Sequence, residues 1–186
     1  MKKLFYGVLM LFSVGANAQK IDNKGKAEMY AGVGLVPIQS ILSLDGNSNA
    51  NMQITDVLSV FMGGDFFTGK YFAVGGQLNY YNNKYTSSNP SGQIYNRRNQ
   101  VIATMVRLRA NWISRKNFSL YSSFALGTCV IIQSEPISLL GKRNATVYPA
   151  YQWSYVGIRV GGDAAFFAEF GNGFQGFISA GFSARF

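Results

Sequence analysis

The feature that most constrains this chain is the alternation of residues 174–186. Every second position, up to Phe182 and Phe186, carries an apolar or small side chain, whereas the positions between them carry mostly small or polar groups such as Ser179 and Arg185. A period of two predicts a β-strand whose two faces meet different environments. An aromatic residue at the end of the apolar face indicates a membrane boundary, because aromatic side chains concentrate where lipid meets water.

The apolar content of the chain is high but divided into short pieces. Hydrophobic residues make up 48% of the sequence, yet no stretch after residue 18 approaches the roughly 20 residues of a membrane-spanning helix. Charged residues make up only 13%, against roughly 25% in ordinary soluble domains. A soluble β-sandwich and a membrane barrel with an apolar exterior both fit this composition, so the placement of loops and charges has to distinguish them.

The first 18 residues have the three parts of a secretory signal peptide. The basic pair Lys2-Lys3 precedes an apolar run at 4–14, which is followed by a small-x-small cleavage motif that ends at Ala18. The run is too short to cross a bilayer as a helix, so we predict cleavage between Ala18 and Gln19. The predicted segments are a signal peptide at 1–18, a short periplasmic lead-in at 19–25 and a barrel at 26–186.

Eight segments after the signal share the alternating pattern, and most are close to the 9–11 residues with which a tilted strand crosses a membrane. The expected strands are 26–36, 54–64, 71–81, 101–112, 118–131, 150–160, 164–171 and 174–186. Long polar connections near 37–53, 82–100 and 132–149 alternate with short ones, and Asn172-Gly173 suits a tight hairpin turn. This pattern predicts an all-β fold, a transmembrane eight-stranded antiparallel up-and-down β-barrel with both termini periplasmic. A ten-strand count, with extra strands from the second long loop, stays open.

A sheet in hydrocarbon must close on itself, because an unpaired backbone N–H or C=O group costs several kcal/mol there. We therefore expect the last strand to pair with the first, with Glu28 and Arg185 close to each other across the seam. Eight strands leave an interior that side chains fill. The predicted lumen charges are Glu28, Arg107, Arg109, Arg159, Glu169 and Arg185. We expect them to be paired or bridged by water, since an isolated buried charge is costly.

The sequence contains no recognisable catalytic set, and we expect neither an enzyme nor a cofactor. It has no histidine, which removes Ser–His and Cys–His catalysis and the commonest metal ligand. The single cysteine, Cys129, falls on the lumen face, where we expect a small buried side chain. No phosphate-binding glycine loop, metal cluster or nucleic-acid motif is present in the sequence.

The net charge is +9, or +7 without the two lysines of the signal. The basic residues of the predicted outer loops are Lys84, Arg97, Arg98, Lys142 and Arg143. They are not gathered on one face, so we expect no nucleic-acid partner. Phosphorylated lipopolysaccharide is a candidate partner for them, and simple solvation of the loops is the alternative.

Two stretches resemble known outer-membrane barrels. The ending, with Ser179, Gly181, Ala184 and Phe186, resembles the C-terminal insertion signal of Gram-negative barrels. The last third, from Tyr155 onward, resembles the C-terminal hairpins of small porin-like barrels of the OmpA and OmpX type in the Bacteroidota. The resemblance implies an outer-membrane location and folding by the barrel-assembly machinery, but no single activity.

We therefore expect an integral outer-membrane barrel with a structural or interaction role, a filled lumen and outward-facing polar loops, alone or within a larger envelope complex. One alternative is an anion-preferring channel or a ligand-binding barrel, with the lumen arginines selecting the solute. Another is a secreted, soluble, lipocalin-like binder.

Overall fold

The structure, a computed structural model, describes residues 22–35, 53–54, 58–88, 94–134 and 143–186. Among these residues, no helix is long and apolar enough to cross a membrane. The strands are β1 (Ala27–Leu35), β2 (Gln53–Ile54), β3 (Leu58–Phe67), β4 (Phe72–Ser88), β5 (Ile94–Arg115), β6 (Phe118–Ser134), β7 (Arg143–Gly161), β8 (Ala164–Gly173) and β9 (Ile178–Arg185).

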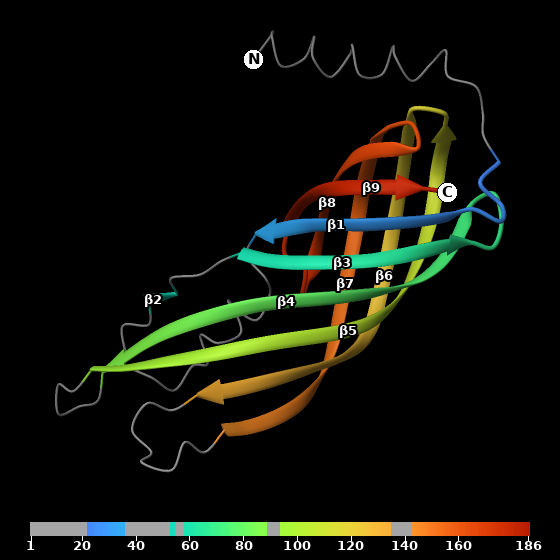
Figure 1. Cartoon of the computed structure of the whole chain (residues 1–186). Coiled ribbons are helices and arrows are strands. Elements are labelled where there is room, and N and C mark those ends of the chain that lie inside the picture. Colours follow the sequence, from blue (N-terminus) through green and yellow to red (C-terminus); the bar gives the residue numbers. More distant parts are fainter. Residues whose placement is uncertain (1–21, 36–52, 55–57, 89–93, 135–142) are drawn as a thin grey trace, which may run out of the picture.

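Eight of these strands close into an antiparallel barrel, in which each strand pairs with its neighbours (Figure 1). The seam lies between β1 and β9, where Glu28 is opposite Arg185, and β1 pairs on its other side with β3. The two-residue strand β2 pairs only with the far part of β4. The predicted all-β antiparallel barrel and the count of eight are therefore confirmed and the ten-strand count is wrong, whereas the periplasmic location of the termini stays a prediction.

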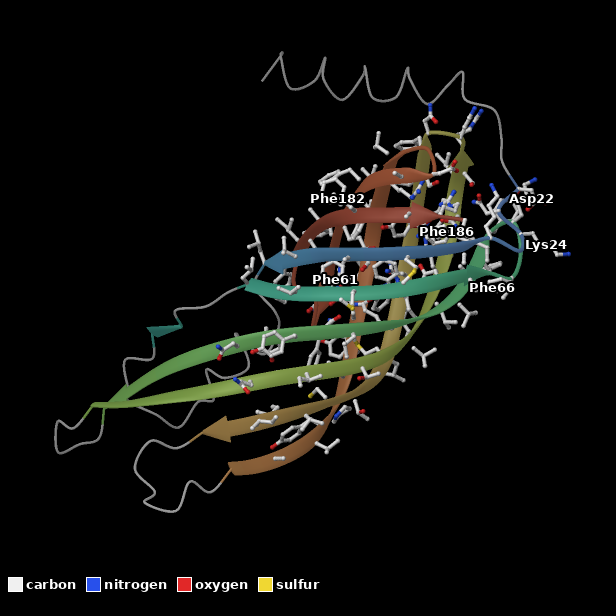
Figure 2. The ribbon with its side chains drawn as sticks, in the orientation of Figure 1. Asp22, Lys24, Phe61, Phe66, Phe182 and Phe186 are labelled. Atoms are coloured by element: carbon white, nitrogen blue, oxygen red, sulfur yellow. The ribbon has the colours of Figure 1, made fainter. Side chains whose placement is uncertain are left out.

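The wall of the barrel is apolar outside and polar inside. Strand β3 shows the alternation: Phe61 is buried in the lumen with 2% of its surface exposed, whereas Phe66 projects outward and is 53% exposed (Figure 2). On other strands, Phe182 is 73% exposed, while Arg107 is 1% exposed. Because successive side chains of a strand point to opposite faces, one sequence supplies both surfaces.

Strands β4, β5 and β7 are much longer than predicted and β6 is three residues longer, and all four run well past the ends of the other strands (Figure 1). The expected loops at 82–100 and 132–149 are wrong over most of their length, because pairing continues to Ser88 opposite Ile94 and to Ser134 opposite Arg143. The alternation used to find strands requires one face to meet lipid. Beyond a membrane both faces can be polar, so these segments carried no such signal.

Two further boundaries differ from the prediction. Strand β3 runs three residues beyond Gly64 to Phe67, because Gly64 pairs with Gly76 in the ladder instead of starting a turn. The expected hairpin turn at Asn172-Gly173 is wrong, since β8 continues through Gly173 and the turn occupies 174–177. Phe174 therefore does not share the outward face of the last strand: it is buried in the interior.

Candidate functional site

The candidate site is the set of charged side chains that the inward faces of the strands gather in the lumen. We call it the lumen network, and its members are Glu28, Asp65, Arg107, Arg109, Arg159, Glu169 and Arg185. Each member has at most 7% of its surface exposed. The network thus holds four guanidinium groups and three carboxyl groups in a space closed off from solvent, where each charge has to be neutralised locally.

Glu28 on β1 is the centre of one half of the network. Its Oε1 accepts a hydrogen bond from Arg109 Nη1 at 2.9 Å, and its Oε2 accepts from Arg185 Nε at 3.0 Å and Nη2 at 2.5 Å. Arg159 Nε lies 3.4 Å from the same Oε2. One carboxylate therefore joins guanidinium groups from β5, β7 and β9, and it does so beside the β1–β9 seam.

Glu169 on β8 is the centre of the other half. Its Oε1 accepts from Arg107 Nη2 at 2.5 Å and from the Tyr121 hydroxyl at 2.7 Å. Its Oε2 accepts from the Ser154 hydroxyl at 2.7 Å and from Gln175 Nε2 at 3.1 Å. Both carboxylate oxygens are thus satisfied by donors that come from four different parts of the chain.

Aromatic rings connect the two halves. The guanidinium carbon of Arg109 lies 3.6 Å from the centroid of the Tyr121 ring, and that of Arg107 lies 4.5 Å from the centroid of the Tyr30 ring. Stacking of this kind stabilises a buried cation without a second carboxylate. These ring contacts explain how four arginines can be buried together with only three acidic side chains.

At one end of the lumen, the β8–β9 turn folds inward and places Gln175 among the strands. The side chain of Gln175 donates to Glu169 and Ser179, and its Oε1 accepts from Gln77 Nε2 at 3.0 Å. Its backbone N–H donates to Gln152 Oε1 at 2.8 Å. Gln175 is fully buried, so this turn is part of the barrel interior.

Beyond Gln175, the lumen side of the long strands is apolar. Phe174 packs against Tyr81, with ring centroids 6.5 Å apart. The two belong to a buried cluster with Val101, Ala103, Met105, Ala125, Cys129 and Ala150. This cluster covers the polar network on the side of the long strands.

At the opposite end, the lead-in segment before β1 covers the lumen. Asn23 has no exposed surface, and its Nδ2 donates to Ser114 Oγ at 2.6 Å. Its Oδ1 accepts from Arg185 Nη1 at 3.0 Å. Asn23 therefore bridges β5 and β9 across the mouth of the barrel, at the end where Phe186 lies (Figure 2).

Asp65 on β3 is the least satisfied member of the network. Neither of its carboxyl oxygens has a hydrogen-bond donor, and Arg109 Nη1 lies 3.6 Å from Oδ2. Arg107 Nε and Arg109 Nη2 also lack acceptors. Buried groups of this kind are the ones that internal water molecules bridge in folded proteins, and we expect ordered water here.

The six predicted lumen charges all lie inside the barrel, and the structure divides the four arginines between the two acids, with Arg185 bound to Glu28. Arg109 and Arg159 approach Glu28, whereas Arg107 approaches Glu169. Cys129 is also buried on the lumen side, with 1% of its surface exposed.

The other predicted site residues lie outside this network. Ser179 and Gly181 face the lumen from β9, whereas Ala184 and Phe186 belong to the outward face. Of the basic residues expected in loops, Lys84 lies in β4, Arg97 and Arg98 lie in β5 and Arg143 begins β7. Ala18, Gln19 and Lys142 fall outside the described residues, and the cleavage site stays a prediction.

Sequence reasoning missed several residues that complete the network. Asp65 was missed because Gly63-Gly64 was interpreted as the end of a strand. Gln175 was missed as a member of the network because the turn was expected at Asn172-Gly173, before the residues 174–177 that form it. Asn23 was missed because it stands in a segment without periodicity. Tyr30, Tyr121 and Gln175 had a usable signal, since all three stand on the polar face of their alternating segments.

The described residues contain no group of three or more His, Cys, Asp or Glu side chains able to hold a metal ion. The arrangement that they do contain is a set of ion pairs centred on Glu28 and Glu169, with Asp65 less completely satisfied, and it is covered at both ends. Chemically, such an interior holds strands together through buried charge pairs.

Comparisons with known proteins give a fold. No protein-family model matches the sequence, and no curated protein matches it. The barrel is similar to the outer membrane protein OprG from Pseudomonas aeruginosa, with a TM-score of 0.50 and 10% identity over 88% of this chain and 97% of that chain. Ail, the attachment invasion locus protein of Yersinia pestis, solved with the heparin analogue sucrose octasulfate, aligns at 9% identity over 88% of this chain and 99% of that one, with a TM-score of 0.47. At 10% identity the likeness to OprG shows a shared fold, and the Bacteroidota-like hairpins stay a prediction.

Proposed function

We propose that the chain is an integral outer-membrane β-barrel with a structural or interaction role, in which the lumen is filled and does not conduct. In this proposal the termini lie on the periplasmic side and the long strands β4 to β7 extend outward from the cell. The proposed role is non-enzymatic, and the engagement of the buried acids Glu28 and Glu169 in ion pairs supports it.

The observation that carries the proposal is the inverted distribution of polarity. Large apolar side chains project from every strand that closes the barrel; Phe72, Val106, Ile158 and Phe182, for example, are 40% to 73% exposed. Soluble monomers rarely expose a contiguous apolar patch larger than a few hundred Å². A wall that is apolar around its circumference suits hydrocarbon, and a lumen of paired charges suits the inside of a small membrane barrel.

The height of the apolar wall supports the same environment. Strand β1 is nine residues long, which matches a tilted strand that crosses the apolar layer. At its first residue, Ala27, the paired residue on β3 is the outward-facing Phe66. At its last residue, Leu35, the paired residue on β9 is Ile178, which in turn pairs with the outward-facing Phe170 on β8. Aromatic side chains near both ends of a crossing strand are typical of the two interfaces of a membrane.

The same interior argues against the two alternative functions. An anion channel needs a continuous polar path, whereas Gln175 with the Phe174 cluster covers one end of this lumen and Asn23 covers the other. A lipocalin-like binder needs an apolar cavity inside and a polar surface outside, which is the reverse of this distribution.

The membrane proposal is tested on the chain expressed without residues 1–18. We expect the folded protein to require detergent or lipid for solubility and to migrate faster in a denaturing gel before boiling than after. A chain that is monomeric and soluble without detergent would contradict the proposal and support the secreted binder.

The filled lumen is tested by recording from planar bilayers. We expect no steady conductance from the unmodified protein. Stable anion-selective channels whose conductance changes in Arg107→Ala would favour the channel instead, because Arg107 is a fully buried lumen cation.

The proposal includes an anionic partner at the outer end. Lys84 and Arg98 are directly opposite each other in the β4–β5 ladder, well beyond the ends of β1 and β3. Basic positions at the outward rim suit the phosphate groups of lipopolysaccharide. Binding to lipopolysaccharide vesicles should weaken when both are changed to glutamine, and unchanged binding would count against this partner.

A further inference from the structure

The barrel wall has a notch at the end where the described chain begins and ends. Strand β4 starts at Phe72, which pairs with Ala110, and the backbone N–H of Asn111 donates to the carbonyl of Tyr71 at 2.6 Å. Strand β5 continues to Arg115 without a β4 partner. The notch forms a pocket of about 180 Å³, lined by Lys70, Tyr71, Trp112, Ile113, Ser114 and Arg115.

A β-bulge shapes the outer side of this pocket. The register between β5 and β6 shifts between Asn111 and Ile113, so that Trp112 and Ile113 both face outward, with 65% and 37% of their surface exposed. The indole N–H of Trp112 donates to Ser122 Oγ at 2.9 Å, which holds the ring against the wall. The bulge therefore places two successive apolar side chains beside a polar pocket.

The charge of the pocket is positive. Lys70 and Arg115 are in its lining, and none of the lining residues is acidic. Lys70 Nζ lies 5.5 Å from the centroid of the Tyr71 ring. Among the residues that the structure describes, the other charged side chains outside the lumen at this end are Lys24, Lys26 and Lys116 against Asp22 and Asp163. Five cations against two carboxylates give this rim a positive potential that attracts anions.

We propose that this pocket binds the phosphodiester headgroup of an anionic phospholipid from the periplasmic leaflet, an inference that rests on the proposed membrane location. Tyr71 and Trp112 are the residue types that sit at the lipid headgroup level. A headgroup phosphate between Lys70 and Arg115 receives charge-assisted hydrogen bonds from both sides. The acyl chains of the same lipid then lie along Trp112 and Ile113, which a free phosphate ion cannot do.

The test uses the only two tryptophans of the chain, Trp112 and Trp153. In the variant Trp153→Phe, the fluorescence of Trp112 reports the pocket directly. The folded barrel in uncharged maltoside micelles is titrated with short-chain phosphatidylglycerol, and separately with short-chain phosphatidylcholine and with inorganic phosphate. We expect saturable binding of phosphatidylglycerol and at least tenfold weaker binding of the other two.

Matched variants locate the site. Lys70→Ala combined with Arg115→Ala should weaken phosphatidylglycerol binding about 25-fold, from roughly fivefold for each cation. Lys116→Ala removes an exposed cation of the adjacent turn outside the pocket lining and should change binding less than twofold. Should the double variant fail to fold, raising the salt concentration on the parent protein provides the same comparison, because an anion site at the surface weakens with ionic strength.

Three results would overturn the inference: equal binding of phosphatidylcholine, equal binding of inorganic phosphate, or unchanged affinity in the double variant. The barrel's gel migration is measured on the same preparations. A folded, detergent-requiring barrel without a preference for phosphatidylglycerol removes this site and leaves the proposed function standing. A chain that is soluble without detergent removes both.

Discussion

Replacing Glu28 by glutamine should be among the most damaging single changes to the barrel interior. The substitution keeps the shape of the side chain and removes the charge that faces Arg109, Arg159 and Arg185. Three hydrogen bonds to a charged group contribute roughly 1.5–3 kcal/mol each, part of which the glutamine carbonyl retains. Removing one partner of a buried ion pair typically costs 3–5 kcal/mol, because the remaining charge stays buried and uncompensated. We therefore expect a loss of about 4 kcal/mol in the free energy of unfolding.

The measurement is urea unfolding of the protein in phosphatidylcholine vesicles, followed by tryptophan fluorescence and by the fraction of the fast-migrating band on gels. Asp163→Asn is the matched control, because Asp163 is exposed at the β7–β8 turn and should cost less than about 0.5 kcal/mol.

A double variant tests the mechanism. Adding Arg159→Met to Glu28→Gln removes one of the uncompensated charges, so the two changes together should cost at least about 1 kcal/mol less than the sum of the single changes. A loss below about 1 kcal/mol for Glu28→Gln, with no coupling to Arg159, would refute the view that buried charge pairs hold the strands together.

Three further predictions concern the wall and the lumen. Gly157→Ala should lower the free energy of unfolding by about 1–3 kcal/mol, because a Cβ there would clash with the Tyr121 ring, while Gly76→Ala, whose Cβ would meet only the Met105 carbonyl oxygen at an ordinary contact distance of 3.9 Å, should be nearly neutral in the same unfolding assay. Val106→Arg should lower the stability in vesicles by about 2–4 kcal/mol, since the side chain faces outward near the middle of a spanning strand, and an effect no larger in vesicles than in micelles would contradict a lipid-facing wall. Cys129 should react with a maleimide at least a hundredfold more slowly in the folded barrel than in urea, because its thiol is buried, and rapid labelling of the folded protein would show that the lumen is open.

The strands that cross the membrane in our proposal were the most predictable part of the fold. For Tyr30, Arg107 and Phe182 the period of two assigned the correct face, because lipid on one side and a crowded lumen on the other impose opposite demands on neighbouring residues. The seam followed from the need to pair every backbone group, which placed Glu28 opposite Arg185.

The parts that could not be predicted are those in which that alternation does not apply. Strand β4 extends to Ser88, and strand β5 begins at Ile94. Polar residues stand on both faces of these outer parts, so the strands are defined by pairing in the ladder and not by a pattern in the sequence. The inward course of the β8–β9 turn depends on the fit of Gln175 among side chains from five strands. An Asn-Gly preference of about 1 kcal/mol or less is easily overcome by such a set of contacts.

The position of Gln175 has a consequence for the order in which the molecule can form. Its partners include Ser59, Gln77 and Gln152, all of which are synthesised and threaded before it. A partly assembled sheet without the final hairpin lacks strand β9 at its edge. It also lacks the groups of Gln175 that form hydrogen bonds with Ser59, Gln77 and Gln152. The arrival of the last fifteen or so residues therefore seals the wall and completes the interior in a single event, and shorter versions of the chain should stay unfolded on the membrane surface.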